Sequence, residues 1–171
     1  GWDIGFEQYL WEDRISLDTT YFSNRVNDLI VGSGTTAINL NGESPSQGVE
    51  LALNVEVTDA LDLTASYTFT NAETSDGTEQ VRRARHVAGI NLNYGFHDDR
   101  GNINLGIDYN GNQKDFEFDA GFNRTIVTLD AFTLVNLQAS YDVTENIQLF
   151  ARGENLLNEQ YEEVFTFGTP R

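Results

Sequence analysis

Acidic side chains in two polar segments are the first residues whose types and spacing could do chemistry. They are Glu73, Asp76, Glu79, Asp115, Glu117 and Asp119. In the second group, alternate acids run up to Gly121, which partly resembles the oxygen-rich loop that binds calcium. The remaining ligand positions of such a loop are missing. We therefore expect these acids to keep the loops soluble rather than to hold a metal ion.

Basic side chains form one local cluster, around His86. Arg82, Arg83 and Arg85 come just before it, where a polar segment gives way to an alternating one. Such a cluster could contact an anionic lipid headgroup or an acidic group of a ligand. A solvated cap at the start of a strand is the simpler interpretation, and we prefer it at this point.

Catalytic chemistry finds little support in the rest of the sequence. The chain has no cysteine, which excludes disulfides, thiolate zinc sites and cysteine nucleophiles, and two histidines are too few for a multi-histidine metal centre. No Ser/His/Asp arrangement, glycine-rich phosphate loop or paired-carboxylate motif stands out. We predict no catalytic residue, no cofactor and no metal, and hence a protein that is not an enzyme.

The charge balance argues against nucleic acid as a partner. Ten Lys and Arg residues stand against 27 Asp and Glu residues, so the formal net charge is −17. Affinity for phosphate backbones comes from neutralisation by Lys and Arg, which are mostly scattered along this chain. We therefore predict no nucleic-acid partner.

The elements that carry these residues are strands, because apolar and polar residues alternate with a period of two. In the cleanest stretch, the apolar Val49, Leu51 and Leu53 are interleaved with Glu50 and Ala52. The pattern recurs and gives candidate strands at residues 2–10, 15–21, 49–57, 61–69, 88–96, 103–109, 135–143 and 147–151. No segment has a convincing helical pattern. The sequence therefore predicts an all-β fold of eight strands in a single segment, residues 1–171.

The connections between these strands alternate strictly between short and long. Short turns lie at 12–14, 58–60, 97–101 and 144–146, and long polar segments lie at 24–47, 71–85 and 111–128. This alternation indicates an up-and-down antiparallel sheet with every tight turn at one end, as in outer-membrane barrels. Pro45 and Pro170 fall outside the predicted strands, as expected for a residue that cannot donate to a sheet ladder.

Aromatic residues of the apolar face gather near the strand ends in two bands. Trp11, Tyr94, Phe96 and Tyr141 belong to the short-turn end, and Trp2, Phe69 and Tyr109 to the long-loop end. Such bands are typical of a sheet that spans a bilayer. A mean hydropathy of −0.40 and the lack of a long apolar run exclude a transmembrane helix but not transmembrane strands. We therefore favour an antiparallel up-and-down transmembrane β-barrel.

Alternation alone does not decide which face meets water, so two other folds stay open. A soluble β-barrel or sandwich would turn its apolar face inward, and such a barrel could bind a small apolar ligand. A small closed barrel of eight strands could serve as a structural or adhesive outer-membrane protein with a side-chain-filled interior. The membrane folds need detergent for refolding, whereas the soluble fold does not.

The last third of the chain carries a motif that favours the membrane fold. It comprises Arg152, Asn155, Leu156, Asn158, Glu159 and Tyr161, followed by Phe167-Gly168-Thr169-Pro170-Arg171. Earlier matching stretches are Tyr21-Phe22 through Asp28-Leu29-Ile30, Gly48-Val49-Glu50, Tyr67-Thr68-Phe69-Thr70 and Arg82-Arg83-Ala84-Arg85-His86. In this order the motifs resemble the C-terminal barrel of TonB-dependent outer-membrane receptors, especially the vitamin B12 transporter-like branch. Each motif alone is degenerate, but together they span nearly the whole chain.

The resemblance implies a segment of a larger barrel. Barrels of this family have 22 strands and both ends in the periplasm. Because the last predicted strand leaves a short turn and runs outward, the resemblance matches residues 1–171 to strands 14 to 21. The family's glycine between Pro170 and Arg171, its closing strand, its plug domain and its TonB-contacting box are absent. With Gly1 in place of an initiator Met, we expect a truncated receptor that does not transport by itself.

The resemblance also implies a function, namely import of a scarce nutrient such as a corrinoid or a ferric siderophore. The barrel wall would play a passive part in the outer membrane of a Gram-negative bacterium. Its partners would be outer-membrane lipid and lipopolysaccharide, the nutrient, and the plug domain and TonB in the parent receptor.

Two sets of residues are expected to face the interior or the ligand. The inward polar set is Asp18, Glu50, Glu56, Asn91, Asn93, Asp108, Asn136, Gln138 and Arg152, and we expect most of it only to solvate the lumen or bond to a plug. Arg152 and Glu154 could form an ion pair. The loop aromatics are Phe116, Phe118, Phe122, Phe165 and Phe167, which could gather ligand or pack the loops together.

Overall fold

The computed structural model describes residues 1–33 and 36–168, and these form strands without any helix. The strands are β1 Trp2–Leu10, β2 Ile15–Ser33, β3 Thr36–Thr58, β4 Leu61–Ala72, β5 His86–Phe96, β6 Gly101–Asn110, β7 Gln113–Phe118, β8 Arg124–Leu129, β9 Phe132–Thr144, β10 Ile147–Gly153, β11 Glu162–Val164 and β12 Phe167–Gly168. In this part of the chain no helix is long and apolar enough to cross a membrane. The all-β prediction is confirmed.

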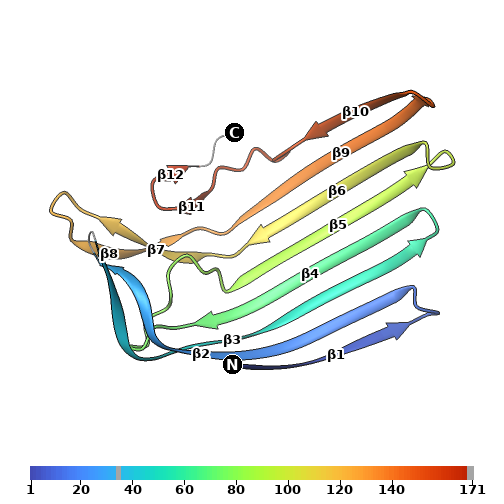
Figure 1. The fold of residues 1–171 in the computed structure, drawn as a ribbon. Coiled ribbons are helices and arrows are strands. Elements are labelled where there is room, and N and C mark those ends of the chain that lie inside the picture. Colours follow the sequence, from blue (N-terminus) through green and yellow to red (C-terminus); the bar gives the residue numbers. More distant parts are fainter. Residues whose placement is uncertain (34–35, 169–171) are drawn as a thin grey trace.

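Eight of these strands form one antiparallel sheet in the order β1-β2-β3-β4-β5-β6-β9-β10. Each strand pairs with its neighbours in the chain, except that the β7–β8 hairpin is inserted between β6 and β9. Figure 1 shows the sheet as a curved wall, with the tight turns at one end and the small hairpins at the other. Among the described residues no ladder joins β1 to β10, so the sheet is an open part of a barrel and not a closed eight-stranded one.

The register of the ladders explains why these segments are strands. Leu51 stands opposite Thr19 on one side and Tyr67 on the other, and its chain neighbour Glu50 stands opposite Thr20 and Thr68. Side chains of one kind therefore line up across neighbouring strands, because successive residues of a strand point to opposite faces. A slip by one residue would exchange the two faces, so the alternation fixes the register.

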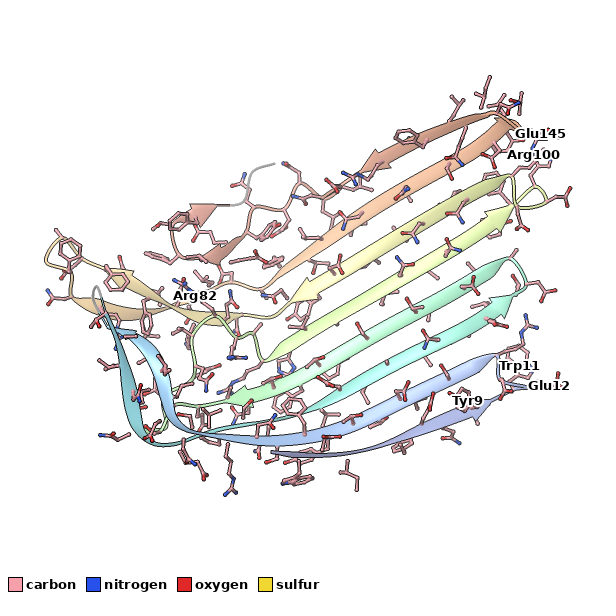
Figure 2. All side chains as sticks on the ribbon, viewed as in Figure 1. Tyr9, Trp11, Glu12, Arg82, Arg100 and Glu145 are labelled. Atoms are coloured by element: carbon pink, nitrogen blue, oxygen red, sulfur yellow. The ribbon has the colours of Figure 1, made fainter. Side chains whose placement is uncertain are left out.

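The tight turns lie together at one end of the sheet, as the sequence predicts. Trp11, Glu12 and Asp13 all adopt left-handed backbone angles, with φ of 54°, 55° and 65°. In Figure 2, Trp11 and Glu12 lie at the same end of the strands as Arg100 and Glu145, and Arg82 lies at the opposite end. We refer to these two ends of the sheet as the turn end and the loop end.

The segment 24–47 is not the long loop that the sequence predicts. Strands β2 and β3 continue past the main sheet as a two-stranded ribbon, paired as far as Ser33 and Thr36. A bulge between Asn27 and Leu29, with Asp28 at φ 54°, shifts the alternation by one residue. The predicted strand ends at residue 21 because the polar run Ser23-Asn24-Arg25 breaks the apolar alternation, and the bulge interrupts the period of two again further along.

The prediction that Pro45 lies outside the strands was also wrong. Pro45 lies within β3, opposite Arg25, just beyond Ser46 where the ladder with β4 ends. Its carbonyl accepts a hydrogen bond from the Glu73 N–H at 3.0 Å. A proline is tolerated there because β3 has lost its strand neighbour on the β4 side. Pro170 lies outside the described residues.

The predicted loop 111–128 contains a second small sheet, the β7–β8 hairpin, and a third is formed by β11 and β12. The most buried side chains of the described chain gather at this end of the molecule, in β7 and β8 and at the loop ends of main-sheet strands, and not in the middle of the sheet. They are Ser44, Ala72, Gln113, Asp115, Leu129 and Phe132. The small core of the protein therefore holds the loop end together, and the wall of the sheet has both faces open.

Candidate functional site

One face of the main sheet is polar across its whole width. The register aligns Asn54, Thr64, Asn91, Gly106 and Asn136 in one row across β3 to β9. Every residue of the predicted inward set lies on this face. Eight of the nine share cross-strand rows with one another, and Glu50 lies two residues along β3 from Ala52, which belongs to the row of Asp18 and Asp108. A hollow of about 570 Å³ lies over the centre of this polar face.

The floor of this hollow is organised by side-chain amides. Asn91 and Asn104 form a reciprocal pair, in which each Nδ2 donates to the other's Oδ1 at 3.1 and 2.9 Å. Asn102 donates to Asn93 at 2.9 Å, and Gly106 leaves the space between the strands open. Amides that satisfy one another give a neutral, ordered surface with donors and acceptors to spare.

The charge on the polar face is uneven. Glu7 on β1 stands directly opposite Asp18 on β2. Glu50 on β3 stands opposite Thr20, two residues along β2 from Asp18. Like charges in directly opposed positions repel each other. At the other edge, the predicted pair of Arg152 and Glu154 is present, with Nη2 and Oε1 3.3 Å apart and both side chains mostly exposed. Several acids of this face therefore lie close together on the first three strands, and others, such as Asp108, lie on later strands.

The opposite face of the sheet is apolar and ends in two aromatic bands. At the turn end, the ring centroids of Tyr94 and Phe96 lie 5.9 Å apart, and those of Phe96 and Tyr141 lie 6.1 Å apart. At the loop end, the His86 ring lies 5.2 Å from that of Phe69, and Tyr67 shares a 2.8 Å hydrogen bond with His86 Nδ1. The predicted bands thus occupy opposite ends of the apolar face, each with a polar group next to its rings.

At the loop end, a buried carboxylate joins three separate segments. The Asp115 side chain has no exposed surface and accepts hydrogen bonds from Arg82 Nε at 2.8 Å, Phe116 N at 2.8 Å and Phe165 N at 2.7 Å. Gln113 adds a bond to the Glu163 carbonyl at 2.9 Å. The β7–β8 hairpin is thereby tied to the segment before β5 and to the β11–β12 hairpin.

This environment lowers the pKa of Asp115. Burial alone raises the pKa of the carboxyl group, but the N–H groups of Phe165 and Phe116 and the Arg82 guanidinium together outweigh it. Asp119 and Asp76 also have lowered pKa values, with Asp76 at about 2, because nearby side chains and N–H groups of their own turns donate to them. These acids serve as turn and loop anchors, and no group of three candidate metal ligands occurs among the described residues.

The basic cluster is split between the two faces. Arg82 is held by Asp115, Arg85 Nε lies 2.9 Å from Glu79 Oε1, and His86 packs among the aromatic rings of the apolar face. Arg82 and Arg83 line a second hollow, of about 470 Å³, at the loop end of the polar face. The three arginines are exposed and come just before β5 begins at His86, where a strand cap would lie, and Arg82 and Arg85 in addition pair with carboxylates.

The predicted loop aromatics differ in exposure. Phe122, at the tip of the β7–β8 hairpin with φ 60°, is 87% exposed, and Phe118 and Phe167 are exposed as well. Phe116 and Phe165 are half-buried, and the guanidinium carbon of Arg124 lies 4.2 Å from the centroid of the Phe116 ring. Three of the five thus present rings to the surroundings on short hairpins.

The residues of the C-terminal motif fold the chain back onto the polar face. Asn155 Nδ2 donates to the Glu159 carbonyl at 2.9 Å, and its Oδ1 accepts from Glu159 N at 2.8 Å. The Asn155 N–H donates to Asn136 Oδ1 at 3.0 Å. The Tyr161 ring then stacks on Phe132, with centroids 4.1 Å apart.

Two further bonds complete this turn of the motif. The Leu156 N–H donates to the Val135 carbonyl at 2.8 Å, and Asn158, with φ 52°, donates its N–H to the Asn155 carbonyl at 2.8 Å. These contacts continue the chain past the end of β10 and over β9. The Thr169-Pro170-Arg171 part of the motif lies outside the described residues.

The sequence model of a family described as "TonB dependent receptor-like, beta-barrel" matches residues 1–156. The chain belongs to the TonB-dependent receptor β-barrel family. The vitamin B12 transporter BtuB of Vibrio cholerae serotype O1 is 31% identical over 150 residues, which cover 86% of this chain and 24% of that protein. The chain therefore spans about a quarter of the length of this relative.

Solved structures of this receptor family have the same fold. The ferripyoverdine receptor of the outer membrane of Pseudomonas aeruginosa matches with a TM-score of 0.79 at 15% identity, over 94% of this chain and 23% of that one. The ferric-catecholate import receptor Fiu of E. coli K12 matches with a TM-score of 0.76 at 17% identity, over 95% of this chain and 24% of that one. The resemblance drawn from the motifs is confirmed at the level of family and fold.

Sequence reasoning did not find the connection between Arg82 and Asp115. These residues are 33 positions apart, and Asp115 looked like one of several solvated loop acids. The one local signal is that Gln113 and Asp115 alternate with Lys114 and Phe116, as in a strand with one buried face.

Proposed function

We propose that this chain forms part of the barrel wall of an outer-membrane receptor that imports a scarce nutrient, either a corrinoid or a ferric siderophore. The observation that carries the proposal is the division of the sheet into a hollowed polar face and an apolar face, in a chain of this receptor family. The named relatives support the choice of nutrient, because one transports vitamin B12 and others receive ferric ligands.

The apolar face would meet lipid, with its aromatic bands at the two headgroup levels. The loop end would then face outward, where lipopolysaccharide lies against the band around His86. This orientation corresponds to the outer membrane of a Gram-negative bacterium.

The eight strands would correspond to strands 14 to 21 of the family's 22-stranded barrel. In support, β1 runs from the loop end to the turn end, and β10 runs from the turn end to the loop end. In a barrel whose first strand starts in the periplasm, odd-numbered strands run outward and even-numbered strands run inward. The directions of β1 and β10 therefore fit strands 14 and 21. The plug domain and TonB would be partners in the parent receptor, with the plug against the polar face.

The exposed aromatics Phe118, Phe122 and Phe167 would gather the ligand, supported by the half-buried Phe116 and Phe165. The motif residues Arg152, Asn155, Leu156, Asn158, Glu159 and Tyr161 would have a structural role in folding the chain over β9. The role of the barrel wall would be passive, with no catalytic residue, no cofactor and no nucleic-acid partner.

The two other folds have less support. A small closed barrel and a soluble ligand-binding barrel both require a ladder between the first and last strands, and the described sheet is open. The hollow at the centre of the sheet also lies on the polar face, which does not suit a small apolar ligand.

The proposal is tested by expressing the protein, with any flanking sequence that its gene encodes, in a Gram-negative host that lacks its own vitamin B12 transporter. Membrane fractions are assayed for retention of cyanocobalamin and of a panel of ferric siderophores. We expect the protein in the outer-membrane fraction, with one ligand class retained. A protein in the soluble fraction, or one that retains neither class, would contradict the proposal.

A further inference from the structure

The second hollow of the polar face lies where a ligand would enter from the loop end. Its volume is about 470 Å³. It is lined by Thr70, Val87 and Asn110 at the ends of β4, β5 and β6, by residues 82–84, and by Gln113, Glu163 and Val164. Val87 stands opposite Thr68 and Asn110, in the same row as Glu50 of the polar face. The hollow therefore opens on the polar side of the sheet and not on the apolar side.

Arg82 is held at this hollow in a fixed orientation. Its Nε is bonded to the fully buried carboxylate of Asp115, and its backbone N–H donates to the Lys114 carbonyl at 2.7 Å. About half of the Arg82 side chain, 52%, remains exposed. Because the Asp115 bond uses only Nε, the two terminal amino groups of the guanidinium remain available to a ligand. A guanidinium fixed along one edge loses little freedom when its other edge binds an anion.

Arg83 has an unusual position in a strongly acidic chain. Every other Lys and Arg of the described chain has a partner: Arg14, Arg25, Arg82, Arg85 and Arg152 face carboxylates, Arg100 faces backbone carbonyls, Lys114 a hydroxyl and Arg124 an aromatic ring. Within residues 1–33 and 36–168, Arg83 is the one Lys or Arg residue without such a partner, and it lines the hollow. Its charge is therefore available to an incoming anion.

We propose that Arg82 and Arg83 form a subsite for an oxyanion group, a carboxylate or a phosphate, on the imported ligand. Asp115 is the positioning residue of this subsite, because it orients Arg82 without lining the hollow. Glu163 also lines the hollow and opposes anion binding, so its charge limits the affinity. The subsite adds to the proposed function the chemical group by which the ligand would be recognised. It rests on the proposed function only for the statement that the ligand is imported.

The same chemistry could recognise a phosphate of lipopolysaccharide. The position of the hollow argues against this source, because lipid meets the apolar face, where His86 packs beside Tyr67 and Phe69. Thr70, Val87 and Asn110 place the subsite on the other side of the sheet.

The test measures the reactivity of each arginine toward phenylglyoxal in the detergent-solubilised protein, expressed with any flanking sequence of its gene. Inorganic phosphate is the probe, chloride keeps the ionic strength constant, and mass spectrometry reads each site. We expect phosphate to slow modification of Arg82 and Arg83 but not of Arg25 and Arg152, whose side chains are 68% and 64% exposed. Equal protection at all four sites, or no protection, would overturn the subsite.

Matched variants give the sign of the effect. Arg83→Gln should raise the phosphate concentration that protects Arg82 about tenfold, the usual effect of losing one charge-assisted hydrogen bond. Glu163→Gln should lower that concentration, and Arg25→Gln should leave it unchanged. A variant Arg83→Gln that is protected like the parent protein would overturn the proposal.

Two further outcomes separate the subsite from the proposed function. Protection of Arg83 by purified lipopolysaccharide but not by phosphate would overturn the assignment to the polar face. Site-specific protection by phosphate, in a protein that retains neither corrinoid nor siderophore, would support the subsite while contradicting the proposed function.

Discussion

The substitution Asp115→Asn is expected to loosen the loop end of the molecule at a distance from the changed residue. Oδ1 of Asp115 accepts bonds from Arg82 and Phe116, and Oδ2 accepts the bond from Phe165, 50 residues away in the chain. Asparagine has almost the same shape but only one oxygen. If that oxygen replaces Oδ1, the new amide group turns its own N–H groups toward the Phe165 N–H.

The size of the effect follows from these bonds. A hydrogen bond to a charged group contributes about 1.5–3 kcal/mol, and a buried donor left without an acceptor costs about 1–3 kcal/mol. One bond is lost outright at Phe165 and two others are weakened, because the charge on Asp115 is removed. We expect the β11–β12 hairpin to lose about 3 kcal/mol of local stability, which corresponds to a roughly hundredfold larger equilibrium constant for local opening.

Hydrogen exchange of the membrane-embedded protein measures this opening directly. The Phe165 amide should exchange roughly a hundredfold faster in the variant, while amides in the centre of β4 should not change. Asp119→Asn is the matched control, because this exposed carboxylate bonds only to residues 121 and 123 of its own turn. Unchanged exchange at Phe165 in Asp115→Asn would show that packing, and not the carboxylate, holds the segments together.

The same reasoning gives a pH dependence. The pKa of Asp115 is lowered in the folded protein, since its donors outweigh the effect of burial. A carboxyl group with a lowered pKa stabilises the fold above its unfolded pKa, and this contribution is lost as the pH falls through the folded value. Protection of the Phe165 amide should therefore hold from neutral pH down to about 4 and decline below it. A decline centred near pH 6 would implicate another group.

Three further predictions concern the sheet and the C-terminal fold. Leu51→Arg, on the apolar face, should cost about 2–4 kcal/mol and impair membrane insertion, whereas Ala52→Arg, on the polar face, should insert normally in a heat-modifiability assay. Asn104→Ala should lower the free energy of unfolding in detergent by about 1–2 kcal/mol, because the reciprocal amide pair with Asn91 is lost, and an unchanged urea midpoint would contradict this. Phe132→Ala should cost about 3–5 kcal/mol of loop-end stability by removing a buried ring from its stacked partner, measured as proteolysis after residue 153.

Most of the main sheet could be predicted from the sequence, because one physical constraint governs it. A residue such as Leu51 must share a face with Leu53 two positions later, so a period of two identifies both the strand and its faces. The short turns between strands then fix the antiparallel order. The strand ends were less predictable, because the polar run Ser23-Asn24-Arg25 and the bulge at Asp28 both interrupt the alternation in the ribbon that continues β2.

The candidate site at the loop end could not be predicted in the same way. The partners of Asp115 come from chain positions 33 and 50 residues away, and no local pattern records such distances. In the sequence, nothing distinguishes Asp115 from the other loop acids. In the structure, it is the fully buried acid of the described chain, and this burial identifies its role. The cation whose charge is free, Arg83, could be identified only after the partners of the other basic residues were known.

The separation between the sheet and the buried cluster has a consequence for stability. The large apolar side chains of the sheet, such as Ile4 and Leu149, are exposed on their own face, so lipid or detergent must supply the burial that stabilises the strands. The loop end has its own buried side chains, which include Leu129, Phe132 and Asp115. The sheet is stabilised by burial against lipid or detergent, whereas the loop end is stabilised by its own buried side chains. The two parts should therefore open independently. For this reason, a change at Asp115 can release the outer hairpins and leave the strands of the main sheet intact.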